Sequence, residues 1–319
     1  MRVVVSGGTG LVGKALAHAR VARGDQVVIL TRGPARDLAH ACSECGAGGK
    51  VEFVSWTPEQ AGPWMGIVDG ADAVVHLAGA SVADERWTDE RKRLLRSSRI
   101  ESARLLAEAI AKAKAKPSVF ISVSGVGHYG MKTGDEIVTE ESPAGDDFLA
   151  TLTSDWEAAA KPAEDAGVRV VHPRFGLVLG RGGGLYQKLA PIFKAFAGGP
   201  LGDGKQYVPW VHLRDVVRAL EAMIERSDLV GAYNLTAPEP VTMNSFADAL
   251  GASLNRPSLM RVPPFAIKMA MGAEAAQAVL TGQRAIPKRL VDAGFAFVFP
   301  DLRSALADLA SDTREVANA

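Results

Sequence analysis

Short apolar runs rich in β-branched residues alternate along this chain with longer segments whose apolar residues recur at the helical period. Such runs are typical of strands buried on both faces, and their alternation with helices is typical of a parallel sheet. The predicted strands are residues 3–5, 26–31, 51–55, 73–79, 118–124, 169–179 and 233–235. The predicted helices are residues 98–116, 155–166 and 185–197, together with segments that follow residues 13 and 242. This order predicts an α/β fold with a doubly wound parallel sheet.

Three glycines, Gly7, Gly10 and Gly13, separate the first strand from the first helix. A strand, a glycine-rich turn and a helix N-terminus in that order form a phosphate cradle, because free backbone N–H groups and the positive end of the helix dipole face the anion. We expect a side chain at Gly10 to be excluded both by the pyrophosphate and by a left-handed backbone. The motif therefore predicts a Rossmann dinucleotide-binding domain.

The residues after the second strand bear on the choice of dinucleotide. A Rossmann site that prefers NAD carries an acidic residue ~20 residues past the glycines, where it holds the ribose 2′-hydroxyl. This chain has Thr31 and Arg32 there and no acid. A guanidinium suits a 2′-phosphate because it is always charged and binds two oxygens at once. We therefore predict NADP as the cofactor.

The chain is expected to divide into a cofactor domain and a smaller lobe. Residues 1–180 are assigned to the NADP-binding Rossmann domain, to which the chain returns at 210–240. Residues 181–209 and 241–312 are assigned to a mostly helical C-terminal substrate lobe, and residues 313–319 to a tail.

Composition and charge favour a globular enzyme over a nucleic-acid or membrane protein. Lys plus Arg and Asp plus Glu number 36 each, so no net field attracts a polyanion or an anionic membrane. The apolar stretch around residues 265–280 is interrupted by Lys268 and Glu274 and is too short to cross a bilayer. No signal peptide is visible. We expect a cytoplasmic monomer or homodimer.

Cys42 and Cys45 form a single C-x-x-C motif. A structural zinc site needs four ligands, and the chain has no second cysteine pair. The motif also lies in a glycine-rich connection rather than at the head of a helix, as a redox motif would. His40 could add a third ligand, so adventitious metal or a disulfide stays open, but we predict no metal site.

Longer motifs carry a resemblance to a known family. They are residues 76–80 (HLAGA), 86–87, 98–99, 129–130, 156–157, 173–180 (PRFGLVLG), 198–202, 210–215 and 282–289. With the glycine spacing, they make the chain resemble the extended, epimerase/dehydratase-like branch of the short-chain dehydrogenase/reductase superfamily over nearly its whole length. It is most similar to an atypical group labelled nucleoside-diphosphate-sugar epimerase or cell-division-inhibitor homologue, which has its own small C-terminal domain.

This resemblance implies the residues that contact NADP and the role of one acid. Asp215 would cap the N-terminus of the helix that follows it. Gly13 joins the site as the last glycine of the turn, and Gly79 as the residue at which the fourth strand breaks. The family pattern adds Gly7, Gly10, Leu11, Val12, Thr31, Arg32, Leu77, Ala78, Arg99 and Val178.

The chain departs from the family at the catalytic pair. Extended members carry Tyr-x-x-x-Lys on the helix before the sixth strand, where the tyrosine exchanges a proton and the lysine lowers its pKa. Aligning Trp156 and Glu157 with that helix puts Leu149 and Thr153 at the two positions. Neither side chain exchanges a proton near neutral pH, so the usual ketone/alcohol mechanism is in doubt.

Two residues near the end of the fifth strand are candidates to act instead. Tyr129, next to His128, is the nearest phenol on the cofactor edge and is our candidate proton donor. Ser124 is the candidate to hydrogen-bond a substrate carbonyl. Tyr129 could instead stack only on a sugar or base, and Ser124 could instead only cap a strand end. Basic residues of the C-terminal third could meet a phosphorylated substrate, although a solvated surface is the simpler interpretation: Lys205, Arg214, Arg284, Lys288 and Arg289.

Two functions follow from these observations. The first is an NADP-dependent oxidoreductase or epimerase acting on a nucleotide-sugar or another small carbonyl or alcohol compound. The second is an NADP(H)-binding sensor or regulator with little or no turnover, which the missing Tyr-x-x-x-Lys pair favours.

Overall fold

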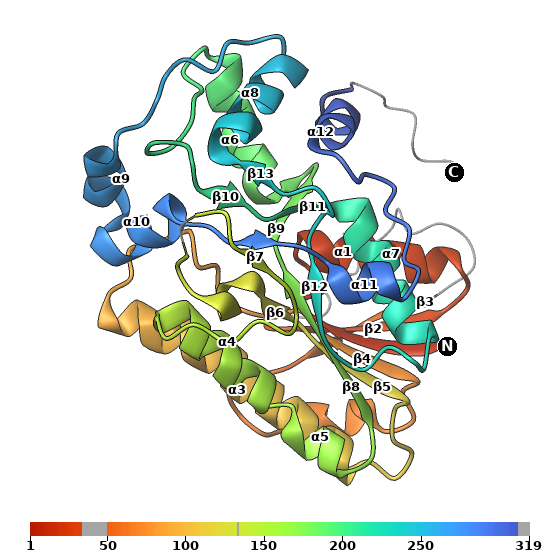
Figure 1. Cartoon of the computed structure of the whole chain (residues 1–319). Coiled ribbons are helices and arrows are strands. Elements are labelled where there is room, and N and C mark those ends of the chain that lie inside the picture. The colour runs from red at the N-terminus through yellow and green to blue at the C-terminus, as the bar shows by residue number, and fades with distance from the viewer. Residues whose placement is uncertain (34–49, 133, 312–319) are drawn as a thin grey trace.

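The computed structural model describes residues 1–33, 50–132 and 134–311. Within them the chain forms a central sheet with helices on both faces, and a mostly helical C-terminal lobe lies at one end of that sheet (Figure 1). The predicted α/β class with a doubly wound parallel sheet is confirmed. Cys42, Cys45 and the predicted tail lie outside the described residues.

The central sheet is 8-stranded and has the order β12-β8-β5-β4-β1-β2-β3, with β6 pairing β8 beside that path. All of these pairs are parallel. The order reverses at β1, which pairs with β2 on one side and β4 on the other, and ligands of open α/β sheets bind at such a reversal. The strands are β1 (Arg2–Ser6), β2 (Gln26–Thr31), β3 (Lys50–Ser55), β4 (Ala73–His76), β5 (Val119–Ser122), β6 (Ser124–Gly125), β8 (Arg169–Phe175) and β12 (Gly231–Leu235).

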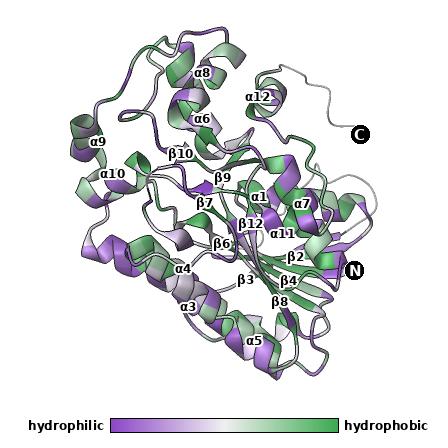
Figure 2. Ribbon diagram, viewed as in Figure 1, coloured by the Kyte–Doolittle hydropathy of each residue, from purple (hydrophilic) through white to green (hydrophobic). Residues whose placement is uncertain are grey.

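Successive side chains of β1 point to opposite faces of the sheet, and each face has its own hydrophobic core. Val3 and Val5 pack with residues of α1 and α7, whereas Val4 packs with residues of α3, because successive side chains of a strand point to opposite faces. Figure 2 shows the central strands largely in the colours of hydrophobic residues. The covering helices are α1 (Leu11–Ala22), α7 (Leu213–Glu225) and α11 (Lys288–Asp292) on one side, and η2 (Pro63–Val68), α3 (Asp89–Lys112), α4 (Phe148–Ala158) and α5 (Lys161–Asp165) on the other.

Two predicted helices have other boundaries in the structure. The helix predicted to begin at residue 98 begins at Asp89, because Thr88 Oγ1 accepts a hydrogen bond from the Arg91 N–H and caps it. The helix predicted at 155–166 is instead two helices, α4 and α5. Asp147 caps α4 by accepting from two backbone N–H groups, and Pro162 lies in the first turn of α5, where a missing N–H is tolerated.

The strand predicted at residues 169–179 is broken into β8 and β9 (Leu177–Gly180). A Cβ at Gly176 would stand 2.3 Å from the Pro209 carbonyl oxygen, so only glycine permits this close crossing. Leu177 N–H donates to the same oxygen at 2.6 Å. The crossing turns β9 away from the main sheet, where it pairs with β11 (Trp210–His212).

The C-terminal lobe has a separate hydrophobic core, centred on Phe193, Phe246, Leu306 and Leu309. Residues 284–297, by contrast, pack on the cofactor domain, since Leu290, Phe295 and Phe297 join the core beneath α1 and α7. No helix in the described ranges is long and apolar enough to span a membrane. The remaining elements are η3 (Val126–Tyr129), β7 (Ile137–Val138), α6 (Gly184–Lys194), β10 (Tyr207–Val208), β13 (Val241–Thr242), α8 (Met243–Ser253), α9 (Pro264–Met271), α10 (Ala273–Leu280), β14 (Arg284–Ala285) and α12 (Leu302–Ala310).

Asp215 does not cap α7, contrary to what the family resemblance implied. The capping side chain is His212, whose Nδ1 accepts from the Arg214 N–H at 3.1 Å. Asp215 lies in the first turn of α7, fully buried, and accepts from the N–H groups of Val298 and Phe299 at 2.7 and 2.9 Å. Its carboxylate therefore joins α7 to the segment that leads into α12.

We expect Asp215→Ala to lower the free energy of unfolding by about 2–4 kcal/mol, because it leaves the buried Phe299 N–H and the part-buried Val298 N–H without an acceptor. Urea unfolding followed by circular dichroism measures this change. Asp228→Ala is the control, since Asp228 forms an exposed ion pair with Arg226 and its loss should lower the free energy of unfolding much less. Equal effects of the two variants would contradict a structural role for Asp215.

Candidate functional site

The turn between β1 and α1 has almost no room for side chains. Gly7 adopts φ +70°, and a Cβ there would lie 2.7 Å from the backbone carbon of Leu77. A Cβ at Gly13 would lie 2.3 Å from the Gly7 carbonyl oxygen. Gly10 has φ −81°, so the left-handed conformation expected at Gly10 occurs at Gly7 instead. A Cβ at Gly10 would meet only the Gly7 oxygen, at 3.4 Å.

The first turn of α1 presents backbone donors without acceptors. Gly10 precedes the helix and offers no side-chain cap. Within the described residues, the N–H groups of Leu11, Val12 and Gly13 make no hydrogen bond, as is usual for the first turn of a helix. These donors and the helix dipole together form an anion site at the end of β1.

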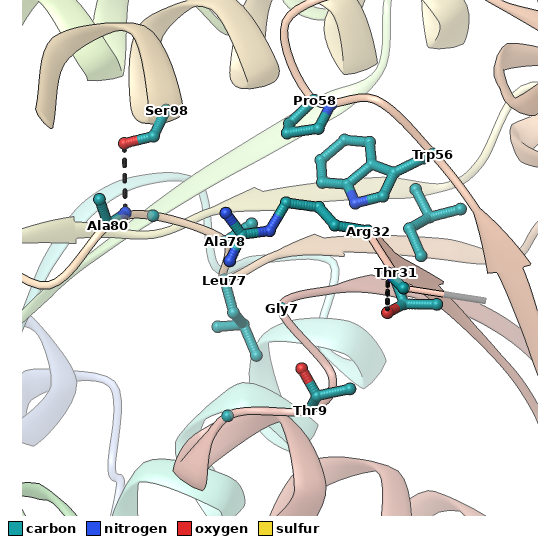
Figure 3. A pocket seen from close by; sticks show the side chains of 14 residues that line it. Gly7, Thr9, Thr31, Arg32, Trp56, Pro58, Leu77, Ala78, Ala80 and Ser98 are labelled. Carbon is teal, nitrogen blue, oxygen red and sulfur yellow. Dashed lines mark hydrogen bonds between the residues drawn. The ribbon is translucent and has the colours of Figure 1, made fainter. Parts of the chain in front are cut away.

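A cavity of about 580 Å³ opens beside this turn (Figure 3). Its walls include seven of the predicted cofactor residues: Gly7, Gly10, Thr31, Arg32, Leu77, Ala78 and Gly79. Sequence reasoning missed the others that line it: Thr9, Leu30, Gly33, Trp56, Pro58, Ala80 and Ser98. Five predicted residues do not line it, namely Leu11, Val12, Gly13, Arg99 and Val178.

Arg32 and Trp56 form the end of the cavity beyond β2 and β3. In Figure 3 the Arg32 side chain extends from the end of β2 into the cavity, and the Trp56 ring faces the same space. Trp56 is held edge-on against Trp64, with ring centroids 5.2 Å apart. No carboxylate of the described residues lines this part of the cavity, so an anionic group near Arg32 meets no like charge from them. The sequence could have pointed to Trp56 as a cavity residue, because it comes directly after β3 and therefore at the carboxyl edge of the sheet.

Arg99 lies behind the opposite wall of the cavity. A Cβ at Gly79 would stand 3.2 Å from the guanidinium carbon of Arg99, which also lies 5.2 Å from the Trp156 ring centroid. Burial lowers the pKa of Arg99 to about 10, and the nearby Arg91 adds to this effect. No carboxylate in the described ranges pairs with Arg99, whose guanidinium donates to the Leu95 carbonyl at 3.2 Å.

His76 is a structural residue beneath the cavity. Its imidazole is fully buried between Ser6 Oγ, 2.6 Å from Nδ1, and Ser102 Oγ, 3.1 Å from Nε2. Burial lowers the pKa of His76 to about 3, so the ring is neutral at physiological pH. Because Ser6 ends β1 and Ser102 belongs to α3, the ring joins β1, β4 and α3.

The positions expected for the catalytic pair face the loop that follows β5. A Cβ at Gly127 would lie 3.3 Å from the Leu149 Cβ, and one at Gly125 would lie 3.9 Å from the Thr153 Cγ2. Thr153 Oγ1 donates to the Leu149 carbonyl at 2.9 Å. Ser124 is buried in β6 at 3% exposure and does not line the cavity. Neither pair position carries a proton-exchanging group.

Tyr129 does not face the cofactor edge, so the orientation predicted for a proton donor is wrong. The side chain is fully buried, and its hydroxyl donates to Asn234 Oδ1 at 2.6 Å and accepts from Arg174 Nη1 at 3.0 Å. Burial raises the pKa of this phenol. Arg174 also forms a two-point ion pair with Glu157, with both N–O distances 2.8 Å. The phenol lies in the core because Arg174 and Asn234 satisfy its hydroxyl there.

Most of the basic residues considered as contacts for a phosphorylated substrate already bond to other groups of the protein. Arg289 donates to the Val230 carbonyl at 2.8 Å and stacks on Tyr233, and Arg284 donates to the Asp135 carbonyl at 3.2 Å. Lys288 pairs with Asp292 at 2.5 Å. Among the described residues, no group of three or more His, Cys, Asp or Glu could hold a metal ion.

The chain matches two family models. One, described as the NAD dependent epimerase/dehydratase family, covers residues 3–236. The other, described as a domain of unknown function (DUF1731), covers residues 262–309. An epimerase family protein of Mycobacterium leprae is 39% identical over 305 residues, which are 96% of this chain and 94% of that protein.

Two solved structures extend the comparison. The human epimerase family protein SDR39U1, crystallised with NADPH, superposes with a TM-score of 0.86 and is 34% identical, covering 98% of this chain and 100% of that one. The nucleoside-diphosphate sugar epimerase from Corynebacterium glutamicum has a TM-score of 0.74 and 32% identity, covering 96% of this chain and 57% of that one.

We expect Tyr129→Phe to lower the free energy of unfolding by about 1–3 kcal/mol, because Asn234 Oδ1 loses its donor and Arg174 an acceptor in the core. Urea unfolding measures the change. Tyr207→Phe is the control: its hydroxyl bonds Asp135 at 2.9 Å on the surface, and its loss should cost less than about 0.5 kcal/mol. A Tyr129→Phe protein of undiminished stability would contradict this structural role.

Proposed function

Because the chain belongs to the NAD dependent epimerase/dehydratase family, we propose that it binds NADP(H) and acts as an oxidoreductase or epimerase. Its substrate would be a nucleotide-sugar or another small carbonyl or alcohol compound. The observation that carries the proposal is the cavity lined by Gly10, Arg32 and the Leu77–Gly79 backbone, which opens beside the first turn of α1. The human relative of known structure, which covers 98% of this chain, was crystallised with NADPH, and this supports the same cofactor here.

The residues in and beside the cavity match the chemical groups of NADP. The free N–H groups of Leu11, Val12 and Gly13 would hold the pyrophosphate, and the absence of a Cβ at Gly10 leaves room for it. Arg32 would hold the 2′-phosphate, and Trp56 beside it would contact the adenosine end. When bound, the cofactor supplies or accepts a hydride.

The proton chemistry has to differ from that of the extended family. Leu149 and Thr153 occupy the pair positions, and Tyr129 is buried with both neighbours hydrogen-bonded to it. Ser124 remains our candidate to hydrogen-bond a carbonyl oxygen, since it lies on β6 at the carboxyl edge of the sheet. A substrate that is turned over would exchange its proton with water or with one of its own groups.

The same observation favours a second function, an NADP(H) sensor or regulator with little or no turnover. A protein of this kind needs the cofactor cavity but no proton donor. Two assays separate these functions: NADPH oxidation by small aldehydes and ketones, and NADP⁺ reduction or epimer formation with alcohols and nucleotide-sugars. Turnover of any compound supports the enzyme, whereas tight NADP(H) binding without turnover supports the sensor.

Arg32→Ala should remove the preference for NADPH over NADH. We expect the wild-type protein to bind NADPH more tightly by about 1–3 kcal/mol, through a charge-assisted contact that NADH cannot make. In the variant, NADPH affinity should fall to the level of NADH while NADH affinity stays unchanged. Fluorescence titration with both cofactors measures this, with Arg303→Ala on the distant helix α12 as the control. Equal wild-type affinities would exclude the assigned role of Arg32.

Gly10→Val should abolish NADPH binding without unfolding the protein. The valine fits the backbone, because φ is −81° and a Cβ meets only the Gly7 oxygen at 3.4 Å. Its side chain would occupy the space above the first turn of α1, which the pyrophosphate needs. Titration and thermal unfolding are both required, and Gly66→Val in η2, where a Cβ meets nothing, is the control. Wild-type affinity in a folded Gly10→Val protein would place the phosphate elsewhere.

A further inference from the structure

Helices α9 and α10, which lie within the domain of unknown function, are weakly packed. Their buried residues are Ile267, Ala275 and Ala276, and none of the three belongs to a hydrophobic core cluster of the described structure. Phe265 is 66% exposed and Met269 71% exposed. The pair therefore owes little of its position to apolar burial, and its opening should cost less than the opening of a core helix.

Polar contacts from several elements hold the pair instead, among them the hydrogen bond that Gln206 Nε2 donates to the Val279 carbonyl of α10 at 3.3 Å. Arg86 donates from Nε to the Ala270 carbonyl at 3.1 Å and from Nη2 to the Met269 carbonyl, so its guanidinium covers the C-terminal end of α9. Lys92, at the start of α3, forms an ion pair with Glu274 of α10. Both basic residues follow the strand end at Leu77–Ala80, which lines the cofactor cavity.

The far end of α10 is attached to the neighbouring loop. Gly282 N–H donates to the Lys132 carbonyl at 2.9 Å, and Gln283 Nε2 donates to the Gly130 carbonyl. The α9–α10 pair thus spans from the loop after β4 to the loop after β6 and η3 (Figure 1). Both loops leave the carboxyl edge of the sheet, where a ligand of such a fold meets its cofactor.

We propose that α9–α10 is a lid over the substrate end of the cofactor cavity, with Arg86 and Lys92 as its latch. This inference rests on the proposed cofactor site and assigns a role to the domain of unknown function. The lid is attached at both ends by backbone hydrogen bonds, from Val262 N–H to the Pro200 carbonyl at 3.0 Å and from Gly282 N–H to Lys132. Gly272, with φ +86° and no neighbour within 4 Å of a Cβ, separates the two helices and leaves each free to tilt.

Hydrogen exchange of the ligand-free protein tests the latch. In the double variant Arg86→Ala/Lys92→Ala, amides of residues 264–280 should exchange about tenfold faster than in the wild type, because both side chains hold the lid by charge-assisted hydrogen bonds. Amides of β1 and β5 should not change. Arg93→Ala/Arg303→Ala, which removes two exposed charges that bond to no lid residue in the described structure, is the matched control. Unchanged exchange at 264–280, or faster exchange throughout the protein, overturns the latch.

Access to bound NADPH tests the lid. In the same double variant, acrylamide should quench the fluorescence of bound NADPH about two- to threefold more strongly than in the wild type, while NADPH affinity stays within about twofold. Faster exchange at 264–280 with unchanged quenching overturns the lid and leaves only a loose helix pair. A wild-type protein that binds no NADPH refutes the proposed function, and the lid with it, while the exchange result still decides whether the latch exists.

Discussion

The candidate site depends on one close contact, between the Gly7–Gly13 turn and the backbone at Leu77. A Cβ at Gly7 would come within 2.9 Å of three backbone atoms of Leu77 and Ala78, and a Cβ at Gly13 would overlap the Gly7 carbonyl. The N-terminus of α1, the end of β1 and the end of β4 therefore meet where the strand order reverses. The cavity, its glycine wall and the free backbone donors of α1 beside it all follow from that meeting.

Buried polar groups support this arrangement and explain why several conspicuous residues are not reactive. His76 is neutral and bonded to serines of β1 and α3, so both of its ring nitrogens serve to join elements. Burial alone would raise the pKa of Glu157, but Arg174 holds it below its usual value. Arg174 and Asn234 in turn hold the Tyr129 hydroxyl. Such fully satisfied networks specify one packing of the core rather than a reaction.

Different segments of the C-terminal part are held by different kinds of contact. Leu290 and Phe295 pack into the main core and cover the edge strand β12, and the lobe helices share a core of their own. Helices α9 and α10 have neither kind of support and depend on Arg86, Lys92 and the attachments at their ends. Elements with little buried apolar surface are the ones that proteins use for moving parts.

The sequence by itself determined the alternation of strands and helices, the phosphate turn and the site of Arg32, because those depend on local periodicity and on glycine spacing. Its placement of Leu149 and Thr153 at the catalytic-pair positions stays a prediction, and in the structure the two residues lie beside Gly127 and Gly125. Only the tertiary structure decided that Tyr129 turns inward, that Asp215 joins two segments and that Trp56 and Ser98 line the cavity. These depend on partners far away in the chain: Asn234 lies 105 residues from Tyr129, and Phe299 lies 84 from Asp215. No local pattern encodes which distant acceptor will satisfy a buried hydroxyl or amide, because that is settled only when the elements pack.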